Sequence, residues 1–343
     1  MASNDQFRVA IVGTGSIAGH FFKSIADIPN ASVVAMCSSS VERAKQAEGQ
    51  YNVPVYHDLS TMLNKEVIDV VCICTASGHH MEPAILSAEH GKHIICEKPL
   101  EITKERAMQI IRVCEKHNVF ISGIFQNRYS KDFLELKSAV DSGMLGKLLV
   151  GNAYIKWFRD DQYYASSPWR GTISGDGGAA FINQGIHTID LLLHIMGEVD
   201  EVYAKVKTMT HQIEGEDVGI AVLEFKSGAL GAIQASTSMW PGYPERLEIF
   251  GERGSVILEG GKIRDWNIQG VAPFDKVQES SAPSGASDPM AISYHLHRRQ
   301  ISEILENIRK HEKPAVDGYE AIKSLELIET IYRSSRDRSS LKI

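Results

Sequence analysis

Two patterns of hydrophobic and polar residues divide the chain. In the first third, five short runs are apolar almost throughout, which is typical of strands buried on both faces of a sheet. These runs are FRVAIV, SVVAMC, VIDVVCIC, KHIIC and VFISGIF. Helical patterns separate them; in the run from Lys104 to His117, apolar residues recur at 107, 110, 111 and 114, and Thr103 is the expected N-cap. Strands alternating with helices predict an α/β fold with a doubly wound parallel sheet.

After about Arg128 the expected strands are longer and alternate between apolar and polar residues. VGIAVLEF and ALGAIQAST predict one hairpin, and RLEIFGERGSVILEG predicts a second around Gly251 to Gly254. These patterns indicate an α+β domain with a large, open, mostly antiparallel sheet. ISEILENIRKH and YEAIKSLELIETIYRSS predict two amphipathic helices, and the Ser-, Pro- and Ala-rich stretch 271–289 predicts a surface loop. We therefore expect domains at 1–127 and 128–343.

Composition narrows the class of protein. A chain of 343 residues with 43% hydrophobic content has enough apolar residues for two domains. Its 36 basic and 43 acidic residues show no basic cluster, which argues against nucleic acid or a membrane as partner. The amino terminus lacks the pattern of a secretory signal, so we expect a cytoplasmic protein. Four of the five cysteines lie in expected strands, which favours buried free thiols over metal ligands.

The first motif with chemistry is VAIVGTGSIAGHF, in which Gly13, Gly15 and Ala18 fill a G-x-G-x-x-A pattern between a strand and a helix. Glycines there permit a tight turn and a close approach of the backbone to a pyrophosphate, which lies at the positive end of the helix. The pattern predicts a dinucleotide site in the first domain, a Rossmann domain. Its expected contacts in this turn are Gly13, Thr14, Gly15, Ser16 and Ile17.

The end of the second strand leaves the choice between NAD and NADP open. Domains that prefer NAD usually carry an acidic residue there, about 20 residues after the glycine motif. This chain has serines instead, including Ser38 and Ser39, followed by Arg43. Serine hydroxyls suit a ribose or a phosphate, and Arg43 either attracts a 2′-phosphate or is a solvated helix residue.

The second motif, IICEKPLEIT, places Glu97, Lys98 and Pro99 after the fifth buried strand. Ligands of open α/β sheets bind outside the carboxyl ends of the strands, so Lys98 is expected to face the cofactor. On its own, the motif is equally consistent with a solvated pair of charges.

The third motif is GDGGAAFINQGIHTIDLLLHIMG, in which Asn183, His187 and Asp190 lie at i, i+4 and i+7 of an expected helix. That spacing puts the three on one polar face. A histidine suits general base catalysis because its ordinary pKa is close to neutrality. The alternative is that His187 and Asp190 form an ion pair that stabilises the helix.

These three motifs, in this order, resemble the family of glucose-fructose oxidoreductase, inositol dehydrogenase and the rhizopine-catabolism dehydrogenases (Gfo/Idh/MocA). The likeness extends over essentially the whole chain and includes GERGSVILEG and the closing DGYEAIKSLELIETIYRSS. It implies an NAD- or NADP-dependent enzyme that moves hydride between nicotinamide and a secondary alcohol of a sugar, sugar derivative, cyclitol or nucleotide sugar. It further implies a homodimer or homotetramer.

The resemblance also assigns roles to residues. Lys98 would contact both the cofactor and the reacting hydroxyl, His187 would be the general base, and Asp190 would belong to the same catalytic group. Cofactor contacts would extend to Thr75, His80 and Glu97. The expected substrate contacts, including aromatic and basic side chains that suit a sugar ring or an anionic group, are Lys98, Arg128, Lys156, Tyr163, Trp169, Arg170, Asn183 and His187.

One departure bears on the substrate. Many sugar and inositol dehydrogenases of this family have Asp where this chain has Asn183, and an amide cannot take a proton. The variant NQGIH resembles a branch that includes dehydrogenases of nucleotide sugars at C3, although free pyranosides stay open. Two alternatives remain: a glycoside-processing enzyme that oxidises C3 transiently and recycles its NAD, and a non-catalytic NAD(P)-binding regulator. The presence of both Lys98 and His187 argues against the regulator.

Overall fold

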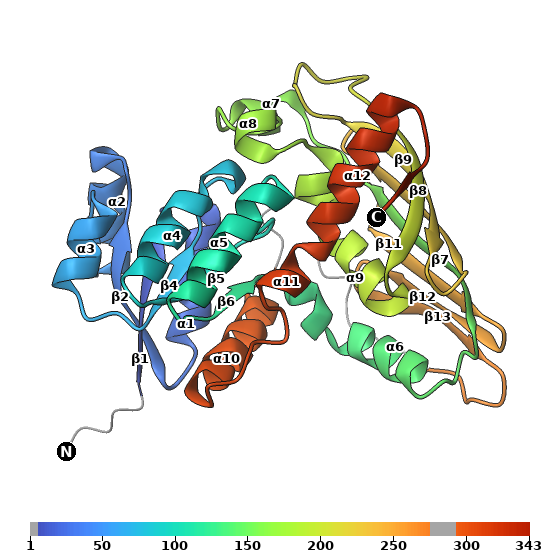
Figure 1. Cartoon of the computed structure of the whole chain (residues 1–343), viewed down its shortest axis with the longest axis horizontal. Coiled ribbons are helices and arrows are strands. Elements are labelled where there is room, and N and C mark those ends of the chain that lie inside the picture. Colours follow the sequence, from blue (N-terminus) through green and yellow to red (C-terminus); the bar gives the residue numbers. More distant parts are fainter. Residues whose placement is uncertain (1–5, 275–292) are drawn as a thin grey trace. The chain divides into compact units, whose positions relative to one another are not determined.

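The computed structural model describes residues 6–274 and 293–343, and the chain divides into two compact units. Unit 1 is formed by Met1–Gln126 and Tyr294–Ile322. Unit 2 is formed by Asn127–Ser293 and Lys323–Ile343. The chain therefore passes from unit 1 to unit 2, returns to unit 1 at Tyr294 and enters unit 2 again at Lys323. Figure 1 labels most of its elements.

Unit 1 is a parallel sheet of six strands in the order β3-β2-β1-β4-β5-β6, which confirms the expected doubly wound Rossmann domain. Its strands are β1 (Phe7–Val12), β2 (Ala31–Cys37), β3 (Val55–Tyr56), β4 (Val70–Ile73), β5 (His93–Cys96) and β6 (Ile121–Gly123). Its helices are α1 (Ser16–Ala26), α2 (Val41–Tyr51), α3 (Leu59–Lys65), η1 (Ser77–His79), α4 (Met81–Glu89), α5 (Lys104–Lys116), α10 (His295–Arg309) and α11 (Gly318–Ala321). The short β3 was not predicted, because two residues are too few to show a period.

Local sequence explains these elements well. All four residues of β4 are buried, as its unbroken apolar run requires. Helix α5 begins at the expected cap, where the Thr103 hydroxyl accepts the N–H of Arg106, and its buried residues include Ala107 and Ile111.

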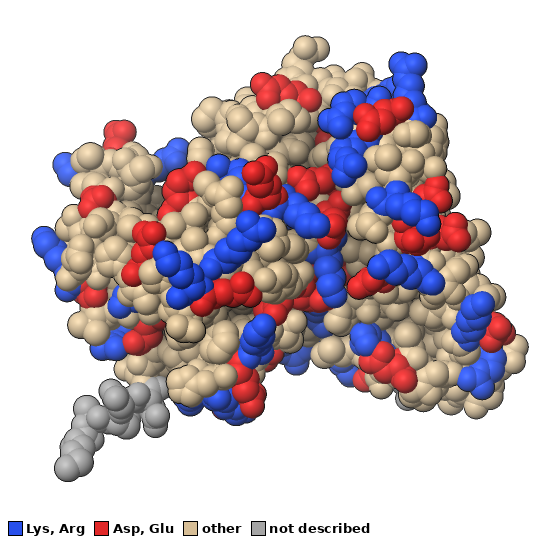
Figure 2. Space-filling model, viewed as in Figure 1, with Lys and Arg blue, Asp and Glu red and all other residues tan. Residues whose placement is uncertain are grey.

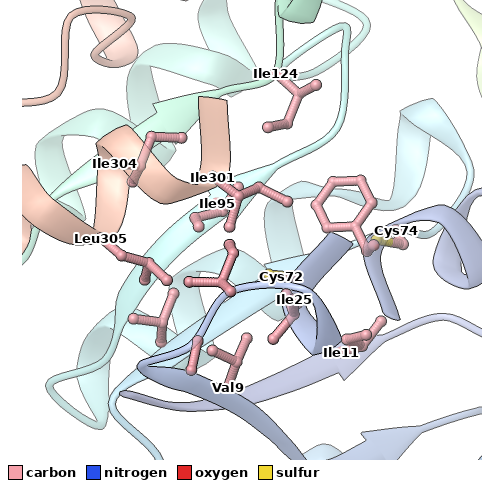
Figure 3. Close-up of a cluster of buried hydrophobic side chains, with 14 of the residues drawn as sticks. Val9, Ile11, Ile25, Cys72, Cys74, Ile95, Ile124, Ile301, Ile304 and Leu305 are labelled. Carbon is pink, nitrogen blue, oxygen red and sulfur yellow. The ribbon is translucent and has the colours of Figure 1, made fainter. Parts of the chain in front are cut away.

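Helix α10 belongs to unit 1 although the sequence analysis assigned it to the second domain. Its stripe of Ile301, Ile304, Leu305 and Ile308 packs into the core that holds β1, β4 and β5 (Figure 3). Sequence period alone shows that such a helix has an apolar face but not which sheet covers that face.

Unit 2 has a sheet of eight strands in the order β13-β12-β11-β7-β10-β9-β8-β14. All neighbours are antiparallel except β7 and β10, so the mostly antiparallel sheet and both predicted hairpins are confirmed. The strands are β7 (Leu148–Lys156), β8 (Val199–Lys207), β9 (Val218–Phe225), β10 (Leu230–Ser236), β11 (Arg246–Gly251), β12 (Gly254–Glu259), β13 (Lys262–Ile268) and β14 (Leu341–Lys342). The helices are α6 (Lys131–Asp141), α7 (Asp161–Ala165), α8 (Ile173–Asp176), η3 (Ala180–Gly185), α9 (Ile186–Met196) and α12 (Lys323–Asp337), and η2 (Gln126–Tyr129) contains the boundary between the units.

Two expected helices differ from the prediction. The helix expected to carry Asn183, His187 and Asp190 begins with a turn of π-helix, η3, and becomes regular only in α9. The helix expected over YEAIKSLELIETIYRSS is two helices, α11 and α12, which separate where the chain leaves unit 1. Most of the predicted surface loop 271–289 lies outside the described residues. None of the described helices has the length and apolar character to cross a membrane.

Candidate active site

The glycine turn of unit 1 has the backbone that a pyrophosphate requires. Gly13 has a φ of +110°, and a Cβ there would lie 2.4 Å from the carbonyl oxygen of Cys74. Gly15 is the N-cap of α1 without a side-chain cap, and nothing lies within 4 Å of where its Cβ would stand. The first N–H groups of α1 therefore lack a side-chain cap from Gly15 and lie at the positive end of a helix, where a phosphate binds. Thr14, Ser16 and Ile17 belong to the same turn, so the residues present fit a dinucleotide.

The three serines after β2 differ in burial and in hydrogen bonding. Ser38 is buried, and its hydroxyl accepts a hydrogen bond from that of Thr14 at 3.2 Å. Ser40 caps α2 by accepting the backbone N–H of Arg43, whereas Ser39 and the Arg43 side chain are exposed. Hydroxyls and an exposed cation near this strand end are compatible with NAD and with NADP.

Lys98 lies half-buried on a loop after β5 that buried carboxylates hold in place. The Glu97 carboxylate accepts the backbone N–H of Lys98 at 2.9 Å. Glu101, whose side chain is fully buried, accepts the N–H of Ile102 at 2.6 Å and pairs with Arg106 at 2.9 Å. These contacts fix the backbone on both sides of Lys98, which limits where its amine can reach.

His80, a predicted cofactor contact, lies between the loops after β4 and β5. It is 1% exposed, its Nδ1 lies 2.9 Å from the carbonyl oxygen of Pro99, and its Nε2 lies 3.2 Å from that of Thr75. Burial lowers the pKa of His80, so we assign the single ring proton to Nδ1, which makes the shorter contact. The Thr75 hydroxyl donates to the His79 carbonyl at 2.8 Å. The Nδ1–H of His80 therefore donates to the Pro99 carbonyl and links the two loops, while Nε2 carries no proton and is an acceptor.

In unit 2, burial singles out two of the predicted residues. Every residue from 178 to 192 is buried except Asn183 and His187, which are half-exposed. Asn183 lies in η3 and His187 in the first turn of α9. A π-helical turn inside an apolar segment is frequent at functional sites because it re-aims side chains. Here it accompanies two polar groups that reach the surface of an otherwise buried element.

Glu216 holds the start of this segment. Its carboxylate accepts the N–H of Phe181 at 2.8 Å and that of Ala179 at 3.2 Å, and the Tyr332 hydroxyl donates to it at 2.9 Å. Burial raises the pKa of Glu216 to about 7, and these hydrogen bonds oppose the rise. Sequence reasoning missed this residue, because nothing near position 216 indicates that it caps a turn 35 residues away.

Asp176 holds the side chain of Asn183. It is 2% exposed, and it accepts the Asn183 amide at 2.6 Å and the backbone N–H of Gly171 at 3.0 Å. The amide oxygen of Asn183 therefore points away from a carboxylate that already takes its N–H group. Asp176 was also missed, although GDGGAAF placed an acid close to the motif.

Asp190 forms a buried ion pair with Arg128. Arg128 donates to its two carboxylate oxygens, from Nε at 2.7 Å and from Nη2 at 2.6 Å, and both side chains are almost completely buried. This bidentate pair ties η2 to α9. It gives Asp190 and Arg128 a structural role, which the sequence analysis did not predict.

The predicted aromatic and basic residues before η3 do come together. The guanidinium of Arg170 lies over the ring of Tyr163 at 4.2 Å and over that of Trp169 at 5.0 Å. Arg170 and Gln184 both donate to the Tyr163 hydroxyl. Within the described part of the chain, Arg170 Nε and Gln184 Oε1 have no hydrogen-bond partner. Both atoms are buried, so this group keeps one donor and one acceptor unsatisfied.

Of the other basic residues in this stretch, Arg159 contacts Tyr163 and Lys156 contacts Tyr154. Arg159, which is buried, has its guanidinium 5.3 Å from the Tyr163 ring centre, and burial lowers its pKa. The Lys156 amine lies over the Tyr154 ring at 5.0 Å. Arg159 lies in the aromatic and basic stretch that the sequence singled out before η3. Gln184 was not among the predicted contacts, although it was visible in the N-Q-G-I-H motif.

Family models match both units. Residues 7–125 match the model described as "Oxidoreductase family, NAD-binding Rossmann fold", and residues 133–257 match the GFO/IDH/MocA C-terminal domain. The chain belongs to the Gfo/Idh/MocA family, as its motifs indicated, and is an oxidoreductase that uses NAD or NADP.

Individual relatives agree over the full length. Myo-inositol 2-dehydrogenase of Thermotoga maritima is 26% identical, over 98% of each chain. An NADP(+)-dependent scyllo-inositol 2-dehydrogenase of Bacillus subtilis is 25% identical over 99% of this chain and 96% of its own. The structure of the WlbA dehydrogenase of Bordetella pertussis, in complex with NADH and UDP-GlcNAcA, has a TM-score of 0.89 and 29% identity over 98% of this chain and 99% of its own.

Proposed function

We propose that the protein transfers hydride between NAD(P) and a secondary alcohol of a carbohydrate, cyclitol or nucleotide sugar, with His187 as the general base. The observation that carries this proposal is the half-exposure of His187 and Asn183 in a segment whose other residues, from 178 to 192, are buried. The named relatives act on inositols, and one neighbour binds a UDP-sugar acid, which supports this range of substrates.

Each residue has a defined task in this reaction. The cofactor, when bound, supplies the hydride acceptor or donor. His187 takes the proton of the substrate hydroxyl during oxidation and returns it during reduction, which suits a group with a pKa near neutrality. Lys98 stabilises the negative charge that develops on the alcohol oxygen. Asn183 accepts a hydrogen bond from the substrate through its amide oxygen, because its N–H group is held by Asp176.

The aromatic and basic group of unit 2 would bind the remainder of the substrate. The rings of Tyr163 and Trp169 suit the apolar face of a sugar, and Arg170 Nε with Gln184 Oε1 suits neighbouring hydroxyls or an anionic substituent. Lys156 is a further contact in this proposal.

The experiment follows nicotinamide absorbance after purified protein is mixed with NAD⁺ or NADP⁺ and a panel of pyranosides, cyclitols, sugar acids and UDP-sugars. We expect reduced cofactor with one substrate class, and a fall in kcat of about 100-fold to 10,000-fold in His187→Ala. Lys98→Met should lose turnover as well. The exposed residues His57 and Lys116 provide matched controls, His57→Ala and Lys116→Met, which should keep the wild-type rate.

Two outcomes would contradict the proposal. Cofactor binding without turnover on any substrate would favour a non-catalytic regulator. Conversion of a glycoside without net formation of reduced cofactor would favour transient oxidation with recycled NAD.

We also infer that the protein forms a homodimer or homotetramer through the open face of its eight-stranded sheet. Tyr203, Ile220, Val222 and Leu230 on β8, β9 and β10 are 43%, 51%, 55% and 55% exposed, and Tyr203 pairs directly with Val222 across the strands. An apolar face of this kind is usually covered by another chain. Light scattering should give a multiple of 37.9 kDa, and Val222→Lys should lower it. The five buried free cysteines are consistent with the expected cytoplasmic location.

A further inference from the structure

Helix α10 brings a histidine into the core of unit 1. Its apolar stripe, which includes Ile301, Ile304 and Leu305, packs with Val9 and Ile95 (Figure 3). His297 lies four residues before Ile301, so it is on the same face of the helix, one turn earlier. It is 2% exposed.

Among the described residues, the ring of His297 has one polar contact, and that contact is with the motif that carries Lys98. Its Nε2 lies 3.3 Å from Oε1 of Glu97, and the two side chains are 2% and 7% exposed. The Phe21 ring of α1 packs at an angle against it with centroids 5.8 Å apart. Its Nδ1 has no hydrogen-bond partner among the residues described. Because a carboxylate only accepts hydrogen bonds, Nε2 carries the ring proton.

The other oxygen of Glu97 accepts the backbone N–H of Lys98 at 2.9 Å. His297, Glu97 and the Lys98 backbone are thus joined in series. Gln300, on the next turn of α10, makes a similar attachment to the chain after β6, since it accepts the N–H of Phe125 and donates to the carbonyl of Gly123, both at 2.9 Å. Helix α10 therefore holds the chain at the carboxyl ends of β5 and β6.

We propose that His297 is a positioning residue for Lys98: by donating to Glu97, it fixes the carboxylate that holds the Lys98 backbone. This inference rests on the proposed function, because it affects turnover only if Lys98 acts in the hydride transfer. Loss of the Nε2 donor would leave a buried carboxylate short of one partner, and Glu97 would turn toward another donor or water. The Lys98 N–H would then lose its acceptor, and the loop would shift.

A small displacement of Lys98 should have a measurable effect on turnover and on the reactivity of its amine. A misplacement of about 1 Å in a reacting constellation costs about 100-fold in rate. A change in the surroundings of a lysine amine also changes its pKa, and with it the fraction of amine that reacts with an acylating reagent. Turnover and the chemical reactivity of Lys98 therefore report on the same position independently.

The test compares wild type with His297→Leu, which removes the donor, and His297→Gln, whose amide can still donate. Acetylation of Lys98 by acetic anhydride is followed by mass spectrometry with Lys116 as internal reference. Turnover is measured on the substrate that the panel identifies, and NAD⁺ affinity by calorimetry. For His297→Leu we expect kcat to fall by about 10-fold to 100-fold. The acetylation rate of Lys98 should change by at least about threefold. NAD⁺ affinity should stay within about twofold of wild type.

The controls separate positioning from folding. His297→Gln should recover most of the lost rate, and His295→Leu, at an exposed position of the same helix, should match wild type. The proposal is overturned if His297→Leu leaves both kcat and Lys98 acetylation unchanged, or if His297→Gln is as impaired as His297→Leu. Should His297→Leu not fold, Glu97→Gln takes its place, and unchanged Lys98 acetylation in that variant overturns the proposal. Turnover that persists in Lys98→Met would instead refute the proposed role of Lys98 in hydride transfer, while Lys98 acetylation in the His297 variants still tests the positioning.

Discussion

The loop around Lys98 in unit 1 and the segment from 178 to 187 in unit 2 are held by contacts of different range. Each carries a side chain to which the proposed function gives a role, and each is held by buried carboxylates. In unit 1, Glu97 and Glu101 accept the N–H of the next residue in the chain. In unit 2, Glu216 accepts backbone groups 35 or more residues away and a hydroxyl 116 residues away.

The difference shows which parts of the site depend on the rest of the fold. A carboxylate that caps its own loop stays satisfied as long as the loop keeps its shape. Glu216 instead stays satisfied only if β9, η3 and α12 are all in place. Unit 1 also has longer-range contacts, from the Met81 N–H to Glu101 and from His297 to Glu97. We propose that the second of these gives long-range control of the Lys98 loop.

The charges on the surface show no such division. On the face drawn in Figure 2, basic and acidic side chains are interspersed over both units. On this face, surface charge therefore does not distinguish the two units.

The largest expected effect concerns the glycine turn of unit 1, which we expect to bind the cofactor through backbone groups. Gly13→Ala places a methyl group 2.4 Å from the Cys74 carbonyl oxygen at a φ of +110°. We expect the affinity for NAD⁺ or NADP⁺ to fall by about 100-fold, measured by calorimetry. Gly49→Ala, a helix position with no atom within 4 Å of the new methyl, is the control and should bind normally. Normal binding by Gly13→Ala would mean that the turn tolerates side chains.

The next effect concerns the buried ion pair of unit 2 between Arg128 and Asp190, which are 62 residues apart in the sequence. Arg128→Met leaves the Asp190 carboxylate buried without its bidentate partner, and we expect a loss of about 3–5 kcal/mol in the free energy of unfolding. Urea unfolding measures it. The double variant Arg128→Met with Asp190→Leu removes both charges and should regain most of that loss. A single variant that costs less than about 1 kcal/mol would show that the pair does not hold α9.

A third effect follows from the pKa of Glu216, which burial raises to about 7 in the folded state from its ordinary value of 4.5. Between these values the folded protein holds a proton that the unfolded chain has released, so stability falls as pH rises through this window. The decline amounts to about 3 kcal/mol between pH 4.5 and pH 7. Urea unfolding at several pH values should show this decline, superimposed on that of other groups, and Glu216→Gln should flatten it. An unchanged slope in Glu216→Gln would assign the decline to other groups.

The smallest effect tests a local contact of unit 1. Thr103→Ala removes the cap of α5 and should cost about 1 kcal/mol in urea unfolding. Turnover should stay at the wild-type value, because the cap acts on its own helix. A clear fall in kcat would mean that even local contacts of unit 1 reach the Lys98 loop.

Most of the fold was predictable because its signals are local. Strand runs, helical periods and the two hairpins all depend on residues close in sequence, and the structure confirms them. The predictions were weaker for side chains whose partners are distant in the sequence. Asp190 pairs with Arg128, 62 residues away, and His80 bonds to the backbone carbonyl of Pro99. Neither contact was predicted, because sequence spacing does not show which groups meet in the core.

By itself the sequence determined the alternation of strands and helices, the glycine turn at Gly13 and the position of Lys98 at the end of a buried strand. These depend on periodicity, backbone freedom and strand polarity, which neighbouring residues set. Only the tertiary structure decided that α10 returns to unit 1, that Glu216 caps η3 and that His187 stays half-exposed among buried neighbours. Those features depend on which surfaces pack together, and burial and charge pairing arise only once segments far apart in the chain are in contact.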